Sequence, residues 1–445
     1  MRTPIENIEV FKKRRQVALD KLGSSALIVT ARPEFIRNDD VHFPYRQDSN
    51  LYYLTGFEEP ESILMLLPGK KAQTVLFVRR KNPERETWDG FRYGPADAQT
   101  VFKFDEVYPI DEFEARAVEM LKGYDGIYYR LRKNAEMDQK VMGVVESLKY
   151  SQGRTGLGLI SIHDADEFLG EMRVIKSSEE LHNLRMACEI SAQGHLSAMK
   201  SVRPGMSERQ VQALLQYEFM SRGSARDGYY PIVASGNAAT TLHYNFNDQP
   251  CKDGDLLLID AGAEYNYYSG DITRTFPVNG KFKKAQLEVY NHVLNIQKQL
   301  IEMVKPGVPF RLFHEKAAEL LTDAMLDLGL LSGRRADIIS AQLHRKYYPH
   351  GMGHYLGMDV HDTGRYVVGS KGEPRPIEEG MTFTVEPGLY IPAADTSAPA
   401  EYRGIGVRIE DNVLVTSTGC EIMTQSAPKE VDDLERLIGS EPTFK

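Results

Sequence analysis

Asp255-Leu256-Leu257-Leu258-Ile259-Asp260 is an apolar run of strand length that ends in a carboxylate. We predict that the strand extends to residue 263. A second run, residues 271–277, begins with the carboxylate of Asp271 and also has the composition of a strand. The segment between them contains Gly262 and Gly270, and it is long enough for a turn that brings the two strands alongside each other. The stretch therefore predicts two neighbouring strands, each carrying an acidic side chain.

Three later segments carry side chains of the same chemical kind. His354 follows the glycine-rich stretch 349–353, Glu386 follows the apolar run 382–385, and Glu410 follows the run 406–409. Glycines at 351 and 353 disfavour a helix around His354, so we predict a loop there. Burying a carboxylate at the end of a strand costs several kcal/mol unless a cation compensates it. Four such carboxylates and one imidazole therefore indicate a metal site.

The predicted ligand set favours particular ions. Oxygen ligands with a single nitrogen suit hard or borderline ions such as Mn²⁺, and Zn²⁺ or Co²⁺ are alternatives. Four carboxylates balance two divalent ions, and coordination lowers the pKa of a bound water from about 15.7 to roughly 7. Arg408 shares a strand face with Glu410, where it can offset negative charge or orient a ligand carboxylate. These features predict a dinuclear hydrolase that uses a bridging hydroxide.

Composition limits the class of protein. The chain has 445 residues, 42% of them apolar, and a net charge of −9, which argues against nucleic-acid binding. Its three cysteines show no disulfide or thiolate-metal spacing. Residues 1–7 do not resemble a secretory signal, and no run approaches the length of a membrane span. We expect a cytoplasmic enzyme with no membrane or nucleic-acid partner.

The pattern of apolar residues predicts two α/β domains, residues 1–173 and 174–445. In the first, helices are expected at 6–22, 111–122 and 135–149, strands at 26–29, 62–67, 74–78 and 126–129, and a glycine-rich stretch at 153–158. In the second, helices are expected at 177–202, 207–222, 283–304 and 310–328. Its strands are expected at 232–235, 256–263, 271–277, 355–358, 381–385 and 406–416.

The predicted elements of the second domain form an approximate internal repeat. Residues 177–280 read as two helices and then strands with two predicted ligands, and residues 283–416 repeat that order with three. Two similar halves that close around a shared site would explain why ligands come from both.

A family resemblance extends over essentially the whole chain. The segments 253–262, 269–277, 350–362, 384–390 and 402–411 resemble the pita-bread metallopeptidases and, among them, the aminopeptidase P family. Segment 45–57 is similar to the amino-terminal domain of that family. The resemblance implies a creatinase-like α/β domain followed by a pita-bread catalytic domain of two pseudo-symmetric halves. It also implies removal of the amino-terminal residue from peptides with proline second.

The resemblance implies a role for each site residue. Asp271 and Glu410 would bridge two metal ions, Asp260 would complete one ion, and His354 and Glu386 the other. Glu386 would also take a proton from the bridging water. Substrate contacts and catalytic roles would fall to a further set of residues: His243, His350, His361, Tyr390 and Arg408.

The chemistry of the substrate is consistent with this assignment. An Xaa-Pro bond has no N–H, so a protease that reads substrate by β-pairing is poorly suited to it. An apolar slot and a metal hydroxide are a sensible alternative, and Tyr244, Tyr347 and Tyr348 would suit packing on a proline ring.

Other interpretations remain open at the level of sequence. The nearest is a prolidase restricted to Xaa-Pro dipeptides. A non-catalytic binding protein and a metal-free amidinohydrolase are disfavoured because all five predicted ligands are present. Arg274 is either a strand-end charge or a site residue. Trp88 either packs in an ordinary loop or closes over the site of a neighbouring subunit, since the resemblance implies a homodimer or homotetramer with contacts between amino-terminal domains.

Overall fold

The computed structural model describes residues 7–152 and 160–441, and it divides into two compact units, Met1–Met172 and Arg173–Lys445. Two segments discussed above lie outside the described ranges. They are the glycine-rich stretch 153–158 and residues 1–6, which belong to the segment compared with a secretory signal. No helix of the described residues is long and apolar enough to cross a membrane.

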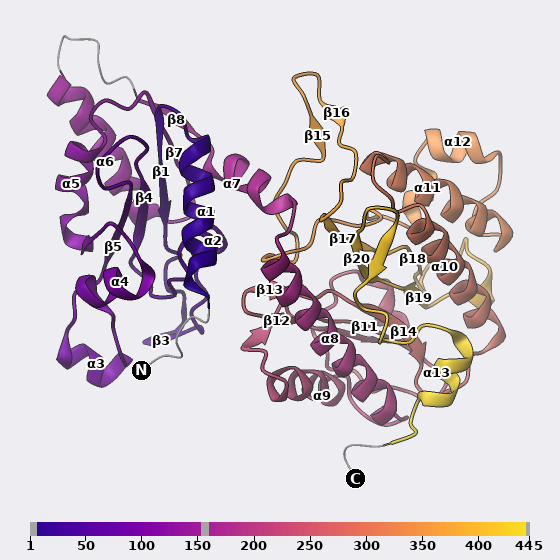
Figure 1. The fold of residues 1–445 in the computed structure, drawn as a ribbon. Helices are drawn as coiled ribbons and strands as arrows, with labels where there is room; N and C mark the ends of the chain where they lie inside the picture. Colours follow the sequence, from indigo (N-terminus) through magenta and orange to yellow (C-terminus); the bar gives the residue numbers. More distant parts are fainter. Residues whose placement is uncertain (1–6, 153–159, 442–445) are drawn as a thin grey trace. The chain divides into compact units, whose positions relative to one another are not determined.

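The amino-terminal unit is a six-stranded mixed sheet with helices on both faces (Figure 1). Its helices are α1 (Ile8–Lys21), α2 (Ser49–Thr55), α3 (Pro83–Asp89), α4 (Gly94–Phe102), η1 (Ile110–Glu112), α5 (Phe113–Met120), α6 (Ala135–Gln152) and α7 (Ala165–Val174), the last of which continues past residue 172. Its strands are β1 (Ser25–Thr30), β2 (Ile36–Asn38), β3 (Val41–His42), β4 (Ile63–Leu66), β5 (Thr74–Val78), β6 (Glu106–Pro109), β7 (Gly126–Tyr128) and β8 (Ser161–His163). The sheet order is β6-β5-β4-β1-β7-β8, and β2 and β3 form a separate hairpin.

Strand alternation explains why this sheet needs cover on both sides. In β1, Ala26 and Ile28 face a core that also contains Phe113 of α5 and Val141 of α6. The alternate side chains of β1 are also buried, and α1 and α2 lie on the opposite side of the sheet from α5 and α6 (Figure 1). The helices and strands predicted for this unit are confirmed.

The carboxy-terminal unit consists of two helix pairs, each followed by strands. The helices are α8 (Ser178–Ser201), α9 (Glu208–Ser221), η3 (Gly236–Thr240), α10 (Lys284–Glu302), α11 (Phe310–Asp327), α12 (Arg335–Ser340), η4 (Leu343–Lys346), η5 (Ala400–Tyr402) and α13 (Val431–Leu437). The strands of the first half are β9 (Arg226–Asp227), β10 (Ile232–Ser235), β11 (Leu256–Asp260), β12 (Ala263–Tyr265), β13 (Tyr268–Ser269) and β14 (Thr273–Pro277). Those of the second are β15 (Val367–Val368), β16 (Glu373–Pro374), β17 (Thr382–Val385), β18 (Gly388–Ile391), β19 (Ile405–Arg408), β20 (Asp411–Val415) and β21 (Cys420–Ile422).

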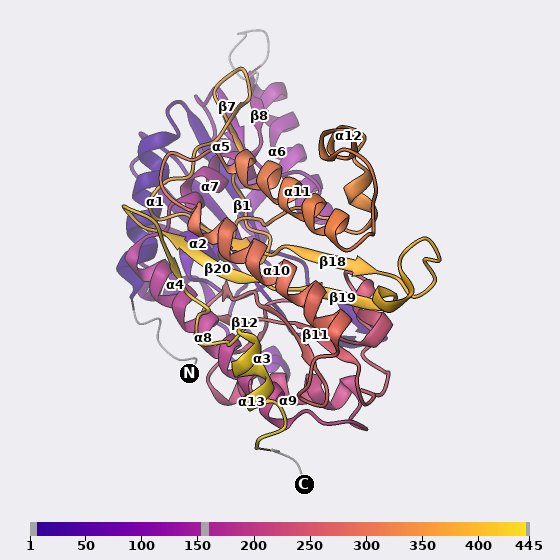
Figure 2. The same cartoon turned by 90° about the vertical axis from the view of Figure 1, so that its right-hand side faces the viewer.

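Both helix pairs cover strands that lead to the predicted ligands. Ser177 caps α8 in a capping box with Glu180, and Ser207 caps α9 with Gln210, which explains where both helices begin. Figure 2 shows α10 lying across β18 and β19, with α11 beside α10. The strands form small sheets, β10-β11-β14, β17-β20-β21 and β18-β19 among them. The predicted α/β architecture with two similar halves is confirmed.

Several predicted strands are shorter than expected, and the interruptions fall at predicted ligands. The run 256–263 breaks after Asp260 because Gly262 packs so closely on Gly270 that a Cβ at Gly262 would lie 1.8 Å from the carbonyl oxygen of Gly270. β14 begins only at Thr273, so Asp271 precedes it, and the run 406–416 is divided at Glu410. The strand predicted at 355–358 is wrong, since that segment contributes only a single bridge to β17.

Candidate metal centre

A cavity of about 520 Å³ in the carboxy-terminal unit collects nine of the ten predicted site residues. The nine are Asp260, Asp271, His354, Glu386, Glu410, His243, His350, His361 and Arg408. The tenth, Tyr390, is 3% exposed and contacts the cavity through His350 and Arg408. The sequence therefore predicted a set of side chains that the fold brings together from both halves.

Each predicted ligand lies at a break in regular structure. Asp260 is the last residue of β11, Asp271 lies two residues before β14, and Glu386 follows β17 directly. Glu410 lies between β19 and β20, and His354 lies in the predicted loop. Gly353 in this loop packs against β17, where a Cβ would lie 1.9 Å from the carbonyl oxygen of Thr384. The close approach places His354 beside the end of β17.

Three of the side chains converge most closely. One ligand atom from each of Asp271, His354 and Glu410 lies within 4.8 Å of the other two. His354 Nε2 is 3.4 Å from Asp271 Oδ2 and 3.5 Å from Glu386 Oε1. The other ring nitrogen, Nδ1, lies 3.0 Å from the carbonyl oxygen of Tyr355, to which it can donate its proton. The neutral ring in that tautomer has Nε2 unprotonated and directed at the carboxylates, as a metal ligand requires.

The electrostatics of the cavity favour bound cations. Burial, followed by repulsion from Asp271 and Glu386, raises the pKa of Glu410 well above its ordinary value. Burial also raises the pKa of Asp271, and it raises the pKa of Glu386 to about 7. Among the described residues that line the cavity, Arg408 is the only arginine or lysine against four carboxylates. Divalent ions would compensate the remaining negative charge, so the donor set fits the predicted metals.

Each guanidinium nitrogen of Arg408 donates a hydrogen bond to a protein group. Its Nη2 donates to Asp260 Oδ2, its Nη1 to the hydroxyl of Tyr390 at 2.9 Å, and its Nε to Thr273 Oγ1 at 3.0 Å. The ion pair with Asp260 is compatible with both roles considered for Arg408, because it orients that carboxylate and offsets part of the negative charge. Arg408 lines the cavity, and the buried Tyr390 lies behind it.

His350 continues this network toward the cavity. Its Nε2 lies 2.7 Å from the Tyr390 hydroxyl, and its Nδ1 lies 2.7 Å from the carbonyl oxygen of Gly351. Burial, with a smaller contribution from Arg408, lowers the pKa of His350 to about 3. The imidazole is therefore neutral, with Nδ1–H donating to the carbonyl and Nε2 accepting from the tyrosine.

His243 and His361 form the accessible part of the site. Both are exposed, and the His361 ring centroid lies 4.3 Å from that of His354 in an edge-to-face arrangement. Partial desolvation beside the cavity wall and the neighbouring His354 lower the pKa of His361. Two histidines that can reach a ligand in the cavity thus stand beside the carboxylate cluster.

The aromatic residues expected to pack on a proline ring behave differently. Tyr244 is buried and donates to Glu208 Oε2 at 2.8 Å, and Tyr347 is buried and donates to Asp395 Oδ2 at 2.7 Å. Neither lines the cavity, because both hydroxyls are satisfied by carboxylates elsewhere in the fold. Tyr348 is also buried, with its ring centroid 4.7 Å from that of His350. The proline-packing prediction is wrong for Tyr244 and Tyr347.

Comparison with known families decides the identity of this arrangement. Residues 182–417 match the family described as metallopeptidase family M24, and residues 11–128 match the amino-terminal domain of aminopeptidase P. The chain belongs to the aminopeptidase P branch of the M24 metallopeptidases. It is therefore a hydrolase, as the ligand pattern predicted.

Relatives of this M24 chain align with it over nearly its full length, in keeping with the family assignment. It is 40% identical over 432 residues to the Xaa-Pro aminopeptidase of Haemophilus influenzae, covering 97% of each chain. The structure of Pseudomonas aeruginosa aminopeptidase PepP matches with a TM-score of 0.92 and 41% identity over 98% of each chain. A zinc-substituted Escherichia coli aminopeptidase P in complex with product matches with a TM-score of 0.91 and 38% identity, again over 98% of each chain.

Sequence reasoning missed three residues that contact the ligands of this M24 site. The Tyr229 hydroxyl lies 2.6 Å from Asp271 Oδ1, and Thr273 Oγ1 donates to Glu410 Oε2 at 2.6 Å. Asn412 bonds to the backbone of Asp271. Thr273 and Asn412 could have been suspected because each lies two residues from a predicted ligand. Tyr229 offered no such signal, because it is far from both carboxylates along the chain.

Two residues with open interpretations are also placed. Arg274 is completely buried behind the ligands, where it pairs with Asp411, so it is neither a strand-end surface charge nor a residue that lines the cavity. Trp88 lies on α3 rather than in a loop, and its 81% exposure excludes ordinary packing within this chain.

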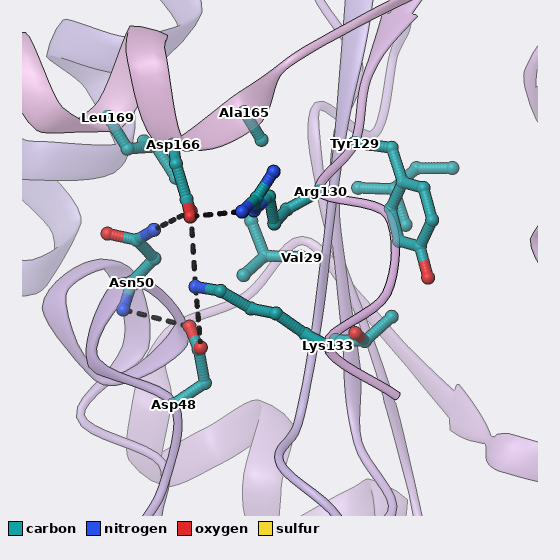
Figure 3. A pocket seen from close by; sticks show the side chains of 11 residues that line it. Val29, Asp48, Asn50, Tyr129, Arg130, Lys133, Ala165, Asp166 and Leu169 are labelled. Carbon is teal, nitrogen blue, oxygen red and sulfur yellow. Dashed lines mark hydrogen bonds and ion pairs between the residues drawn. The ribbon is translucent and has the colours of Figure 1, made fainter. Parts of the chain in front are cut away.

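A second group of charged residues, in the amino-terminal unit, is not a comparable site (Figure 3). Asp166 accepts from Asn50, Lys133 and Arg130, and Lys133 also contacts Asp48. The carboxylates are thus paired within the group. The hollow has a volume of only about 10 Å³, which is room for about one water molecule. This cluster joins segments of the unit and leaves no space for a substrate.

Proposed function

We propose that this chain is a dinuclear metal-dependent aminopeptidase that releases the amino-terminal residue from peptides with proline in the second position. The observation that carries the proposal is the convergence of four carboxylates and one metal-competent imidazole on a cavity with two accessible histidines. The names of similar proteins support the choice of Xaa-Pro peptides as substrates.

Asp260, Asp271, His354, Glu386 and Glu410 would hold two divalent ions, with Asp271 and Glu410 shared between them. Mn²⁺ is the proposed ion, and Zn²⁺ and Co²⁺ suit the same donors; a related enzyme has been described in a zinc-substituted form. When bound, the ions would lower the pKa of a shared water so that a hydroxide nucleophile is available near neutral pH.

The chain's own residues would handle the protons. Glu386 follows β17 directly and lines the cavity, where its carboxylate would act as the general base. The proline nitrogen must gain a proton as the scissile bond breaks, because it leaves as a secondary amine. Glu386 would take a proton from the attacking water and return it to that nitrogen. Its Oε1 accepts a hydrogen bond from Thr384 Oγ1 at 3.2 Å, which helps hold the carboxylate in place.

The histidines at the cavity would bind the peptide. His243 and His361 are exposed to the cavity and can donate to the peptide carbonyl, and to the oxyanion that develops on it. His350 would line the substrate site as a neutral imidazole fixed by Tyr390. Arg408 would act on substrate indirectly, by holding Asp260 and Tyr390.

The decisive experiment compares a longer peptide, Xaa-Pro-Yaa-Zaa, with the dipeptide Xaa-Pro. Turnover of the longer peptide that is lost on chelation and restored by Mn²⁺ is the expected result. Turnover of the dipeptide alone would identify a prolidase, which the names of the similar proteins do not favour. Failure to cleave either peptide with metal bound would refute the proposed substrate class.

We also propose a cytoplasmic homodimer or homotetramer, with residues 1–173 providing oligomer contacts and site closure and residues 174–445 providing catalysis. The three cysteines are free, which suits a reducing compartment. Several large apolar side chains of the amino-terminal unit are exposed. Trp88 is one, and the others lie on or beside the β2–β3 hairpin: Phe35, Ile36, Val41 and Phe43. Light scattering should give the parent chain a mass that is a multiple of 50.3 kDa. The Phe43→Ser variant should have a smaller mass, because the substitution weakens the contact between subunits. A monomeric full chain would contradict the assembly.

A further inference from the structure

The backbone of Asp271 is held by a side chain rather than by a neighbouring strand. The ladder between β11 and β14 begins with the pair Asp260 and Thr273, so Asp271 lies beyond its end. The Asp271 N–H donates to Asn412 Oδ1 at 2.9 Å, and Asn412 Nδ2 donates to the carbonyl oxygen of Asp271. One amide side chain thus replaces both bonds that a partner strand would supply.

Asn412 is itself fixed within the second half. It lies in β20 opposite Thr384 of β17, and its side chain is completely buried. Its own N–H donates to Thr424 Oγ1 at 3.1 Å, and Cys188 Sγ donates to its Oδ1 at 3.2 Å. With these partners the amide group cannot rotate without breaking hydrogen bonds in a buried environment.

A matching interaction runs in the opposite direction. Arg274 of β14 donates to the carbonyl oxygen of Glu410 and, at 2.6 Å, to Asp411 Oδ1, and both partners are buried. The second half therefore holds Asp271 through Asn412, and the first half holds Glu410 through Arg274. These contacts fix the backbone positions of Asp271 and Glu410, which belong to different halves.

We propose that Asn412 is a positioning residue that sets the placement of Asp271 relative to Glu410 and thereby determines how tightly the two-metal site binds its ions. The inference rests on the proposed roles of Asp271 and Glu410 as shared ligands. Two buried carboxylates repel each other in the absence of metal, so a backbone free to move would let them separate. Holding both backbones in advance avoids that reorganisation when the ions bind.

The test is the Mn²⁺ affinity of the full-length loaded enzyme, measured as metal retained at graded chelator concentrations. Asn412→Ala, which removes both bonds, is expected to weaken Mn²⁺ binding by about 10- to 100-fold, as for other groups that orient metal ligands. Asn412→Leu fills the space without hydrogen bonds and should show the same loss if Asn412→Ala is too unstable to purify.

Asn247 provides a matched control. It is also completely buried, and its amide bonds to the N–H of Val233 and the carbonyl oxygen of Pro231. Asn247→Ala should lower the melting temperature but leave Mn²⁺ affinity unchanged. If Asn412→Ala and Asn412→Leu both bind Mn²⁺ as tightly as the parent, or Asn247→Ala loses as much affinity, Asn412 acts only through general stability and the inference is wrong.

Asp271→Ala in the same assay separates this inference from the proposed function. If Asp271→Ala keeps its metal, the proposed ligand set fails. If Asp271→Ala loses metal while both Asn412 variants retain parental affinity, only the positioning role of Asn412 fails.

Discussion

The hydroxyl of Tyr229 lies 2.5 Å from Asp260 Oδ1 and 2.6 Å from Asp271 Oδ1. A phenol has one proton, so it can donate to only one of these carboxylates at a time. Burial and the neighbouring carboxylates raise the pKa of Tyr229 well above its ordinary value, so the hydroxyl stays protonated. Tyr229 therefore orients two proposed ligands that approach from different segments.

Replacing Tyr229 with Phe should weaken Mn²⁺ binding by about 10-fold or more while preserving the fold, because the ring keeps its packing. Chelator competition measures the affinity, and circular dichroism checks the fold. Tyr230→Phe is the control, since the neighbouring side chain is 57% exposed. Equal Mn²⁺ affinity in Tyr229→Phe and the parent would show that the hydroxyl does not orient the ligands.

His361 and Glu410 should separate catalysis from metal binding. His361→Ala should retain its metal and lose about 100-fold or more in kcat, because one donor to the developing oxyanion is removed. Glu410→Ala should lose bound metal and activity together. Metal analysis and steady-state kinetics on an Xaa-Pro-Yaa-Zaa peptide provide both readouts. Normal cleavage by His361→Ala would remove His361 from the catalytic set.

At the scale of elements, α8 carries a histidine whose surroundings oppose protonation. His195 is completely buried, and its Nε2 donates to the carbonyl oxygen of Ala261 at 3.0 Å. Its Nδ1 has no hydrogen-bond partner among the described residues. Burial lowers the pKa of His195 to about 4. Protonation would therefore place an uncompensated charge beside β11.

The depressed pKa of His195 predicts acid sensitivity. Its contribution to stability is complete above the unfolded pKa of about 6.5, and it is lost as the pH falls toward 4, because the unfolded chain takes up the proton first. Between pH 7.5 and 5 the parent should lose about 2 kcal/mol more unfolding free energy than His195→Gln. Urea unfolding at both pH values measures the difference. His182→Gln, an exposed position on the same helix, should follow the parent, and parallel profiles for all three proteins would contradict the prediction.

The strands show where periodicity alone is insufficient. Apolar runs correctly located β11, β14, β17, β19 and β20, but the strands predicted at 256–263, 271–277 and 406–416 included ligand positions or ran beyond them. One interruption coincides with a close contact that apolar periodicity does not report, that of Gly262 with Gly270. A strand that ends at a ligand leaves that side chain free to turn toward the cavity.

At the scale of the whole molecule, the two halves of the carboxy-terminal unit meet at the proposed metals. Asp260 and Asp271 come from the first half, and His354, Glu386 and Glu410 from the second. Metal that binds only the folded state should therefore stabilise both halves together. It should raise the free energy of unfolding of this unit by about 2.7 kcal/mol when the free ion is at 100 times its Kd.

Removal of metal should accordingly lower the melting temperature of the carboxy-terminal unit, and added Mn²⁺ should restore it. Scanning calorimetry with and without chelator measures the shift. Glu410→Ala should melt at a temperature that does not respond to chelator. A parent protein whose melting is equally unaffected would contradict a metal site that joins the two halves.

The sequence by itself determined the α/β organisation, most helix and strand positions, the five predicted metal ligands and Arg408 beside them. It could do so because apolar periodicity reports local structure, and because acidic residues at the ends of apolar strands are too costly to bury without a purpose. The family resemblance added His243, His350, His361 and Tyr390, and the roles expected of all ten site residues.

Only the tertiary structure decided which groups form hydrogen bonds to the predicted site residues and hold them in place. Tyr229, Thr273 and Asn412 act through hydrogen bonds to residues up to 141 positions away in the chain, and Arg274 is buried between the halves. Local sequence gives no measure of such contacts, since each depends on how two separately folded segments meet. The same reason explains why Tyr244 and Tyr347 point into the core, where carboxylates of other elements satisfy their hydroxyls.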